Sequence, residues 1–290
     1  MISASLSPKQ FVMPIQGEQI HFQGVNYYIG APIGYGAFGG VMECSDDWGN
    51  QLAAKVLLPT GSYEDVRRAW QDEMSKLITL RHPNITYIHA AFEYRETFYI
   101  ILERCAYDLG ALIRSNNFDG KIWIPHVARD VLFALNKIHE WGYVHKDLHP
   151  GNIFIAHHFD SMVPQKEPVW SFKIADFGIS NIEGNIRQAQ TRMAKWMFPP
   201  ELISAEFGSV SRATDFYHFG LILLNMLVPN MSDFSQEQII EGRPRMIAEL
   251  LPSPYAPVIA KSLRRHVQYR YQSAIEFWGD IWKSSREAVN

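Results

Sequence analysis

His145–Asn152 reads HKDLHPGN, and Asp176–Gly178, further along the chain, reads DFG. The first segment supplies a carboxylate at Asp147 and an amide at Asn152, and the second supplies a carboxylate at Asp176. Carboxylate and amide oxygens at this spacing can orient a hydroxyl group and hold divalent cations beside phosphate groups. The two segments therefore predict a site that binds phosphate groups, with further residues of that site expected on both sides of them.

The composition limits the class of protein. The chain has 290 residues and 47% hydrophobic content, enough to form the core of one large domain or of two joined lobes. Its 27 basic and 30 acidic residues give a net charge of −3, so we expect no nucleic-acid partner. Cys44 and Cys105 are too few for a disulfide framework or a zinc site, which favours a reducing compartment.

The apolar segments are short. Residues 1–10 lack the basic start and the apolar stretch of a secretory signal. The longest apolar runs, such as Phe219–Val228, fall short of the roughly 20 residues that cross a bilayer. We therefore expect no membrane span and a cytoplasmic location.

Hydrophobic patterns divide the chain into three parts. Residues 1–24 form an N-terminal tail whose role stays open, because prolines and polar residues interrupt any period. Residues 25–106 should form a small antiparallel β lobe and a hinge, with three strands in Val25–Leu58, a helix at Tyr63–Leu80 and strands at Tyr87–Tyr94 and Thr97–Glu103. Residues 107–290 should form a larger, mostly α-helical lobe, with helices at Leu109–Asn116, Pro125–Trp141, Ala213–Leu227, Ser235–Glu241, Pro252–Arg265 and Ser273–Arg286. The predicted fold class is α+β.

A glycine-rich segment connects the first two of these strands. It consists of Gly34, Tyr35, Gly36, Ala37, Phe38, Gly39, Gly40 and Val41. Backbone amides without Cβ atoms nearby can approach phosphate oxygens closely, although a tight hairpin explains the same glycines equally well. A dinucleotide-binding fold would continue with a helix. Here a second strand follows and leads to Ala53 and Lys55, which favours a loop that covers phosphates.

Lys55 and Glu73 form the next candidate pair. A lysine at the end of an apolar strand is often a surface residue, and a helical glutamate is often solvated. Lys55 nevertheless follows the glycines closely, and Glu73 lies on the predicted helix that comes next. At that spacing Glu73 can pair with Lys55 and aim its ammonium group at phosphates.

Taken together and in this order, these motifs resemble those of eukaryotic-like protein kinases, over roughly residues 26–286. The resemblance implies a bilobal protein-kinase fold that binds ATP and Mg²⁺ and phosphorylates a protein substrate. Asp147 would orient the acceptor hydroxyl and take its proton, and Lys55 would contact the α and β phosphates. Asn152 and Asp176 would hold Mg²⁺. His145 would be a packing and hydrogen-bonding residue.

The resemblance also assigns an adenine site and two structural contacts. Glu103, Arg104 and Cys105 would form the hinge that meets adenine through main-chain groups. Leu102 would lie behind the ring, and Val41, Ala53 and Phe154 would enclose it, although ordinary core packing also explains these four apolar residues. Asp215 should be buried and hold the catalytic segment, and Glu201 should pair with Arg270.

Several positions depart from the family pattern. His149 stands where many serine/threonine kinases have lysine, so it is a candidate catalytic residue of weaker charge. The string DLHPGN also resembles aminoglycoside phosphotransferases, so a small-molecule phosphotransferase stays an alternative, as does a pseudokinase scaffold that binds nucleotide. Lys146 replaces the usual arginine and lacks its planar fork, which argues against control by loop phosphorylation.

The sequence favours serine/threonine over tyrosine as the acceptor, from the overall catalytic-segment pattern. Ser180 and Thr191 are candidate autophosphorylation sites. The physiological substrate and the oligomeric state stay open.

Overall fold

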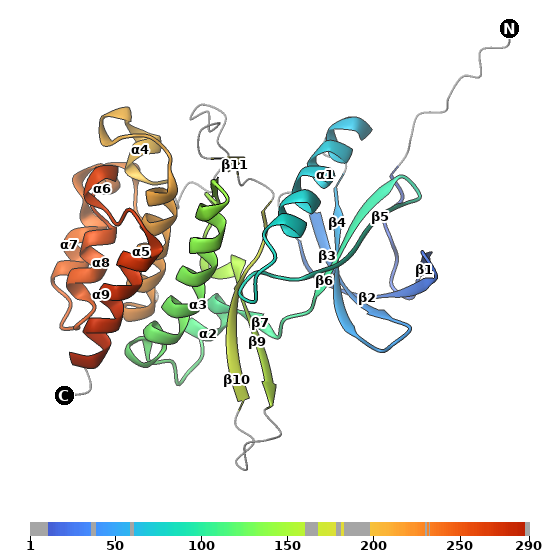
Figure 1. Cartoon of the computed structure of the whole chain (residues 1–290), viewed down its shortest axis with the longest axis horizontal. Helices are drawn as coiled ribbons and strands as arrows, with labels where there is room; N and C mark the ends of the chain where they lie inside the picture. Colours follow the sequence, from blue (N-terminus) through green and yellow to red (C-terminus); the bar gives the residue numbers. More distant parts are fainter. Residues whose placement is uncertain are drawn as a thin grey trace, which may run out of the picture. The chain divides into compact units, whose positions relative to one another are not determined.

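The structure, a computed structural model, describes residues 11–35, 39–58, 61–159, 168–177, 181–182, 198–229, 231 and 233–287. It divides into two compact units, Met1–Arg81 with Thr86–Arg104, and His82–Ile85 with Cys105–Asn290. The first contains an antiparallel sheet and one helix, and the second is mostly helical (Figure 1). The predicted α+β fold class is therefore confirmed.

The sheet of the first unit has six antiparallel strands in the order β1-β2-β3-β4-β6-β5. The five strands predicted from the sequence are present. The strands are β1 (Gln19–Phe22), β2 (Val25–Tyr35), β3 (Gly39–Asp46), β4 (Gln51–Leu57), β5 (Ile88–Tyr94) and β6 (Thr97–Glu103). The sixth strand, β1, lies inside the range that the sequence assigns to an N-terminal tail.

The chain before β2 is joined to this unit by specific contacts. Ile20 of β1 is fully buried and pairs with Tyr27. Farther upstream, the backbone N–H of Val12 donates to the hydroxyl of Thr97 over 2.9 Å, and that hydroxyl lies 3.0 Å from the carbonyl of Val12. Residues 11–22 are thus part of the folded unit.

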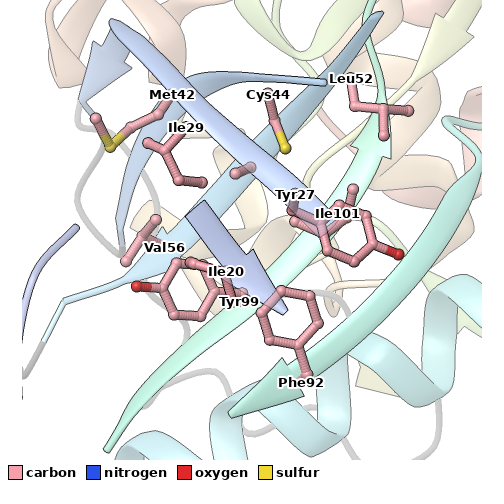
Figure 2. Packing of buried hydrophobic residues seen from close by; sticks show 11 residues of the cluster. Ile20, Tyr27, Ile29, Met42, Cys44, Leu52, Val56, Phe92, Tyr99 and Ile101 are labelled. Carbon is pink, nitrogen blue, oxygen red and sulfur yellow. The ribbon is translucent and has the colours of Figure 1, made fainter. Parts of the chain in front are cut away.

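One face of the sheet forms the core of the unit. Period-2 alternation turns apolar side chains of the strands to the same side. Ile20, Tyr27, Ile29, Met42, Cys44, Leu52, Val56, Phe92, Tyr99 and Ile101 pack together there (Figure 2). The cluster draws on all six strands, so it stabilises the register of β4, which carries Lys55.

Among the described residues of this unit the helix is α1 (Tyr63–Thr79), which nearly matches its predicted range. Ser62 begins it with a capping box, because its side chain accepts from the Asp65 N–H while the Asp65 carboxylate accepts from the Ser62 N–H. The helix packs against β5 and β6, and the indole N–H of Trp70 donates to the carbonyl of Tyr99 over 2.9 Å. The cap and this contact fix the position of Glu73.

The second unit is built mainly of helices. Its α-helices are α2 (Leu109–Ile113), α3 (Gly120–Glu140), α4 (Pro200–Ile203), α5 (Arg212–Leu227), α6 (Gln236–Glu241), α7 (Arg243–Glu249), α8 (Ala256–Ser262) and α9 (Ala274–Glu287). Its strands are β7 (Tyr107–Asp108), β8 (Tyr143–Val144), β9 (Ile153–Phe159), β10 (Pro168–Ile174) and β11 (Asn181–Ile182). Short 3-10 turns in the described residues are η1 (Pro150–Asn152), η5 (Ala205–Phe207) and η6 (Val267–Tyr269).

Several helices in this unit differ from the prediction. The helix predicted from Pro125 begins at Gly120, because the Asp119 carboxylate caps it by accepting from the Lys121 N–H. The range Pro252–Arg265 contains only α8, and α7 was not predicted. No helix in the described part of the chain is both long enough and apolar enough to span a bilayer.

Candidate active site

The glycine-rich segment spans β2, β3 and the residues between them. Gly34 pairs with Val41, and Tyr35 with Gly40, next to a register irregularity at Pro32. A Cβ on Gly39 would lie 2.5 Å from the carbonyl oxygen of Val56, so the close approach of β3 to β4 requires glycine there. Gly36, Ala37 and Phe38 lie outside the described residues. The structure therefore describes the base of this predicted phosphate loop, whose role stays a prediction.

Lys55 and Glu73 form an ion pair inside the first unit. Lys55 Nζ lies 2.6 Å from Glu73 Oε1, and the two side chains are 9% and 5% exposed. Pairing with Val41 and Ile100 on either side fixes Lys55 in the middle of the sheet. The interpretations as a surface lysine and a solvated glutamate are wrong, and the predicted pairing is confirmed. A buried charge is tolerated only when it is paired, so each residue depends on the other.

The predicted adenine residues are divided between the two units. Ala53 pairs with Leu102 across β4 and β6 in the first unit. Glu103 is held there by Tyr87, because its N–H donates to the Tyr87 carbonyl over 2.9 Å and its carboxylate accepts from the Tyr87 N–H over 2.6 Å. Cys105, partly exposed, and Phe154 of β9 belong to the second unit. Their contact with adenine stays a prediction.

Asp215 anchors the catalytic segment in the second unit. It lies on α5, fully buried, and its two carboxylate oxygens accept the backbone N–H groups of His145 and Lys146 over 2.9 and 2.8 Å. Nε2 of His139 lies 2.8 Å from the same carboxylate. Burial favours the neutral acid, but these hydrogen bonds and the nearby histidines outweigh it and lower the pKa of Asp215. The predicted role of Asp215 in holding this segment is confirmed.

His145 connects the catalytic segment to the DFG segment. Its Nδ1 accepts the Asp147 N–H over 3.3 Å, and its Nε2 lies 3.0 Å from the carbonyl of Ala175, so the proton belongs on Nε2. The ring also packs edge-on against Phe177, with centroids 5.2 Å apart. Because His145 is fully buried, it positions its neighbours, as predicted.

Asn152 connects the remaining candidate ligands. Its Nδ2 donates to the carbonyl of Asp147 over 2.9 Å and lies 3.4 Å from the carboxylate of Asp147, so the amide oxygen is turned the other way. Its carbonyl accepts the N–H of Ala175, the residue before Asp176, which has a positive φ of 62°. This backbone bond places the backbone of Asp176 near Asn152, and an amide oxygen with a carboxylate suits a hard cation such as Mg²⁺. No group of three or more histidine, cysteine or acidic residues in the described ranges could hold a metal without other ligands.

His149 differs in chemistry from the lysine that it replaces. Its Nδ1 accepts the N–H of Gly151 over 3.1 Å, which leaves the proton on Nε2. Burial lowers the pKa of His149 more than the nearby carboxylates of Asp147 and Asp176 raise it. The structure therefore favours the neutral Nε2–H tautomer of His149, which is an uncharged donor.

A second buried ion pair supports the helical unit. Arg270 donates through two nitrogens to the carboxylate of Glu201 over 2.9 and 2.6 Å, and both side chains are fully buried. The hydroxyl of Thr214 donates to the same carboxylate over 2.7 Å. The predicted pairing is confirmed, and bidentate geometry with a third hydrogen bond is the arrangement in which a buried pair is best satisfied.

Part of the predicted site lies outside the described residues. This part includes Gly178, Ser180 and residues 183–197 with Thr191, so the predicted autophosphorylation sites stay predictions.

Sequence reasoning missed His139 as a partner of Asp215. Its signal was a polar residue on the apolar face of α3, four positions after Leu135, which is fully buried.

Comparison with known proteins identifies the family. The protein kinase domain matches residues 27–282. The putative serine/threonine-protein kinase/receptor R826 of Acanthamoeba polyphaga mimivirus is 26% identical over 267 residues, which cover 88% of this chain and 14% of that protein. The mitogen-activated protein kinase HOG1 of Hortaea werneckii is 28% identical over 79% of this chain and 60% of its own length. The serine/threonine-protein kinase RAD53 of Saccharomyces cerevisiae is 29% identical over 62% and 21%.

These matches agree with the residues of the site. This chain spans between 14% and 60% of the length of the three relatives. The family match nevertheless covers most of the chain, and it includes Lys55, Glu73, Asp147, Asn152, Asp176 and Asp215. The chain belongs to the eukaryotic-like protein kinase family.

Proposed function

We propose that the chain transfers the γ-phosphate of ATP to a serine or threonine hydroxyl on a protein. The buried Lys55–Glu73 pair, at 2.6 Å, is the observation that carries this proposal. A lysine that only stabilised the fold would have no need of a buried carboxylate, since an apolar side chain of the same size would fill the sheet as well. Held by Glu73, its ammonium group would contact the α and β phosphates of ATP.

The catalytic segment supplies the chemistry at the acceptor. Asp147, oriented by hydrogen bonds from Asn152 and to His145, accepts the proton of the attacking hydroxyl as the γ-phosphoryl group transfers. The neutral Nε2–H of His149 donates a hydrogen bond to the transferring phosphate. Positioning provides most of the rate enhancement, because phosphoryl transfer needs little covalent help from the protein.

Asn152 and Asp176 would hold Mg²⁺. A bound divalent cation neutralises the charge that develops on the phosphate oxygens. The amide of Asn152 is oriented for this by its bond to the Asp147 carbonyl, and Asp176 follows Ala175, whose N–H is bonded to Asn152. ATP and Mg²⁺ are thus the proposed cofactors, and protein substrates the proposed partners.

Two alternatives make different predictions. A small-molecule phosphotransferase would phosphorylate an aminoglycoside in preference to protein, and a pseudokinase would bind ATP without transfer. The names of the relatives favour a protein acceptor, and those of R826 and RAD53 favour serine and threonine. The buried pair and the ordered Asn152–Asp147 contact favour catalysis over a scaffold role.

The test uses the whole chain with γ-labelled ATP and Mg²⁺, and offers a generic protein acceptor and an aminoglycoside in parallel. Phosphoamino-acid analysis then separates serine and threonine from tyrosine. We expect label on serine or threonine of the protein. Preferential labelling of the aminoglycoside, label on tyrosine alone, or no transfer to either acceptor would overturn the proposal.

A further inference from the structure

The segment that contains α7, α8 and the four residues after α8 carries an excess of positive charge. Residues 243–266 contain one acidic residue, Glu249, and five basic ones, which are Arg243, Arg245, Lys261, Arg264 and Arg265. This is an excess of four positive charges within 24 residues, in a chain whose net charge is −3. None of these residues belongs to the catalytic site described above, so catalysis does not account for this positive charge.

A cavity lies between the two helices. α7 packs against α8 in the second unit, and the two lie next to each other in Figure 1. The cavity has a volume of about 300 Å³. Arg245 and Glu249 of α7 line one side, Lys261 and Arg264 the other, and small apolar residues such as Ala260 form the rest. The volume suits one or two side chains of another protein.

The charged side chains at the cavity differ in whether they have ion-pair partners. Arg245 pairs with Glu249 at 2.7 Å, but both side chains are more than 40% exposed, so the pair is weak. Lys261 is engaged from α9, where Glu276 lies at 2.7 Å and Asp280 at 3.4 Å. The guanidinium group of Arg264 makes one hydrogen bond within the described ranges, to the carbonyl of Tyr269, and no ion pair. Its charge is therefore available to an anion.

Two apolar side chains lie beside the cavity. Met246 and Leu250 are four residues apart at the end of α7, and they are 47% and 82% exposed. Met246 lies three positions before Glu249 and four before Leu250, so the three side chains are neighbours on the helix surface, and Glu249 lines the cavity. Exposed apolar side chains close to a cation that has no ion-pair partner in the described residues are typical of a surface that binds another protein.

We propose that the cavity, with Met246 and Leu250 at its rim, is a docking site for an acidic segment of a partner protein. Carboxylates of the segment would enter the cavity and pair with the guanidinium groups of Arg264 and Arg245, whose forks fit carboxylates. An apolar residue of the segment would cover Leu250. A nucleic acid would explain the cations but not the exposed apolar side chains, and a membrane surface would explain both but not the concave site.

The experiment measures binding by fluorescence anisotropy, with the whole chain and no ATP. The probe is a labelled peptide with aspartates and glutamates around one leucine, and the matched control replaces each acid by its amide. We expect the acidic peptide to bind at least about tenfold more tightly at low salt, and its affinity to fall as salt rises. The readout is independent of phosphotransfer, so it stands whether or not the proposed function holds.

Substitutions at the cavity test whether the acidic peptide binds there. Arg245→Ala combined with Arg264→Gln should weaken acidic-peptide binding about tenfold, while glutamine can still donate to the Tyr269 carbonyl. Leu250→Ser should weaken it by a smaller factor. Arg67→Ala, which removes an exposed cation of α1, is the matched control and should bind like the unmodified chain. Thermal unfolding checks that each variant is folded.

Three results would overturn the proposal. The first is equal binding of the acidic and the amide peptide. The second is unchanged binding in the folded Arg245→Ala/Arg264→Gln variant, or an equal loss in Arg67→Ala. The third is tighter binding to a DNA duplex or to phosphatidylserine vesicles than to the acidic peptide, which would assign the cations to a different class of partner.

Discussion

The carboxylate of Asp215 lies 2.8 Å from Nε2 of His139, although 76 positions separate the two residues in the chain. The same carboxylate accepts the N–H groups of His145 and Lys146. Asp215→Asn keeps the shape but turns one oxygen acceptor into a donor and removes the charge. We expect it to lower the free energy of unfolding by about 3 kcal/mol. Urea denaturation measures this, with the exposed Glu241→Gln as a control that should change little.

The loss of unfolding free energy in Asp215→Asn should depend on pH, because the pKa of Asp215 is shifted in the folded protein. The pKa of Asp215 is lower in the folded protein than its unfolded value of about 3.9. Its stabilising contribution is therefore complete above about pH 4 and disappears as the pH falls through the folded pKa. The unfolding free energies of the unmodified chain and of Asp215→Asn should converge in that acidic range. A constant difference down to pH 2 would contradict this account.

The role of the Lys55–Glu73 ion pair can be tested by comparing a single variant with a double variant. Glu73→Met alone leaves a buried ammonium without its partner, and we expect it to cost about 3 kcal/mol of unfolding free energy. Lys55→Met with Glu73→Met removes both charges and should recover most of that stability. Phosphotransfer should be lost in both variants. Recovery of activity in the double variant would show that the pair serves the fold alone.

Thr97 tests whether the segment before β1 contributes to the first unit. Thr97→Val has nearly the same shape but removes the hydroxyl that accepts the Val12 N–H and faces the Val12 carbonyl. We expect a loss of about 1–2 kcal/mol and faster proteolytic cleavage before residue 19. Ser45→Ala, at a half-buried strand position, is the control. Cleavage at the same rate in Thr97→Val and the unmodified chain would contradict this role.

The two cysteines should differ in their reactivity. Burial, with the charge of Asp46, raises the pKa of Cys44 to about 12, so its thiol stays protonated and unreactive at pH 8. Cys105 is partly exposed and should be alkylated first by iodoacetamide. If the hinge residues contact adenine, MgATP should slow the modification of Cys105, as mass spectrometry of the labelled peptides can show. Labelling of Cys44 at a similar rate, or no effect of MgATP, would contradict these expectations.

The sequence predicted the features that depend on local patterns or motifs, and it missed several that depend on residues far apart in the chain. Five of the six strands of the first sheet and α1 followed from period and turn residues, the pairing of Lys55 with Glu73 from motif order, and that of Glu201 with Arg270 from the resemblance to the family. The start of α3 was missed because Pro125 resembles the first residue of a helix, although it lies inside one. α7 was missed because Gly242, with φ of 83°, ends α6 and begins α7 without a loop between them.

Other features had no local signal. The contact between His139 and Asp215 joins α3 to α5 and depends on how the helices pack. The tautomer of His149 depends on the Gly151 N–H, which only the turn at Pro150–Asn152 brings to its Nδ1. The cavity beside Arg264 likewise arises from the packing of α7 on α8.

The most direct test of the proposed phosphotransfer is the single-turnover rate of the unmodified chain and of Asp147→Asn, measured with labelled ATP, Mg²⁺ and a protein acceptor. Asparagine keeps the size of Asp147 but cannot take the proton of the hydroxyl. We expect the rate to fall by about 10²-fold or more, while ATP binding measured by equilibrium dialysis stays within about threefold. Equal rates in the two proteins would contradict the assignment of Asp147, and no transfer by either would contradict the proposed function.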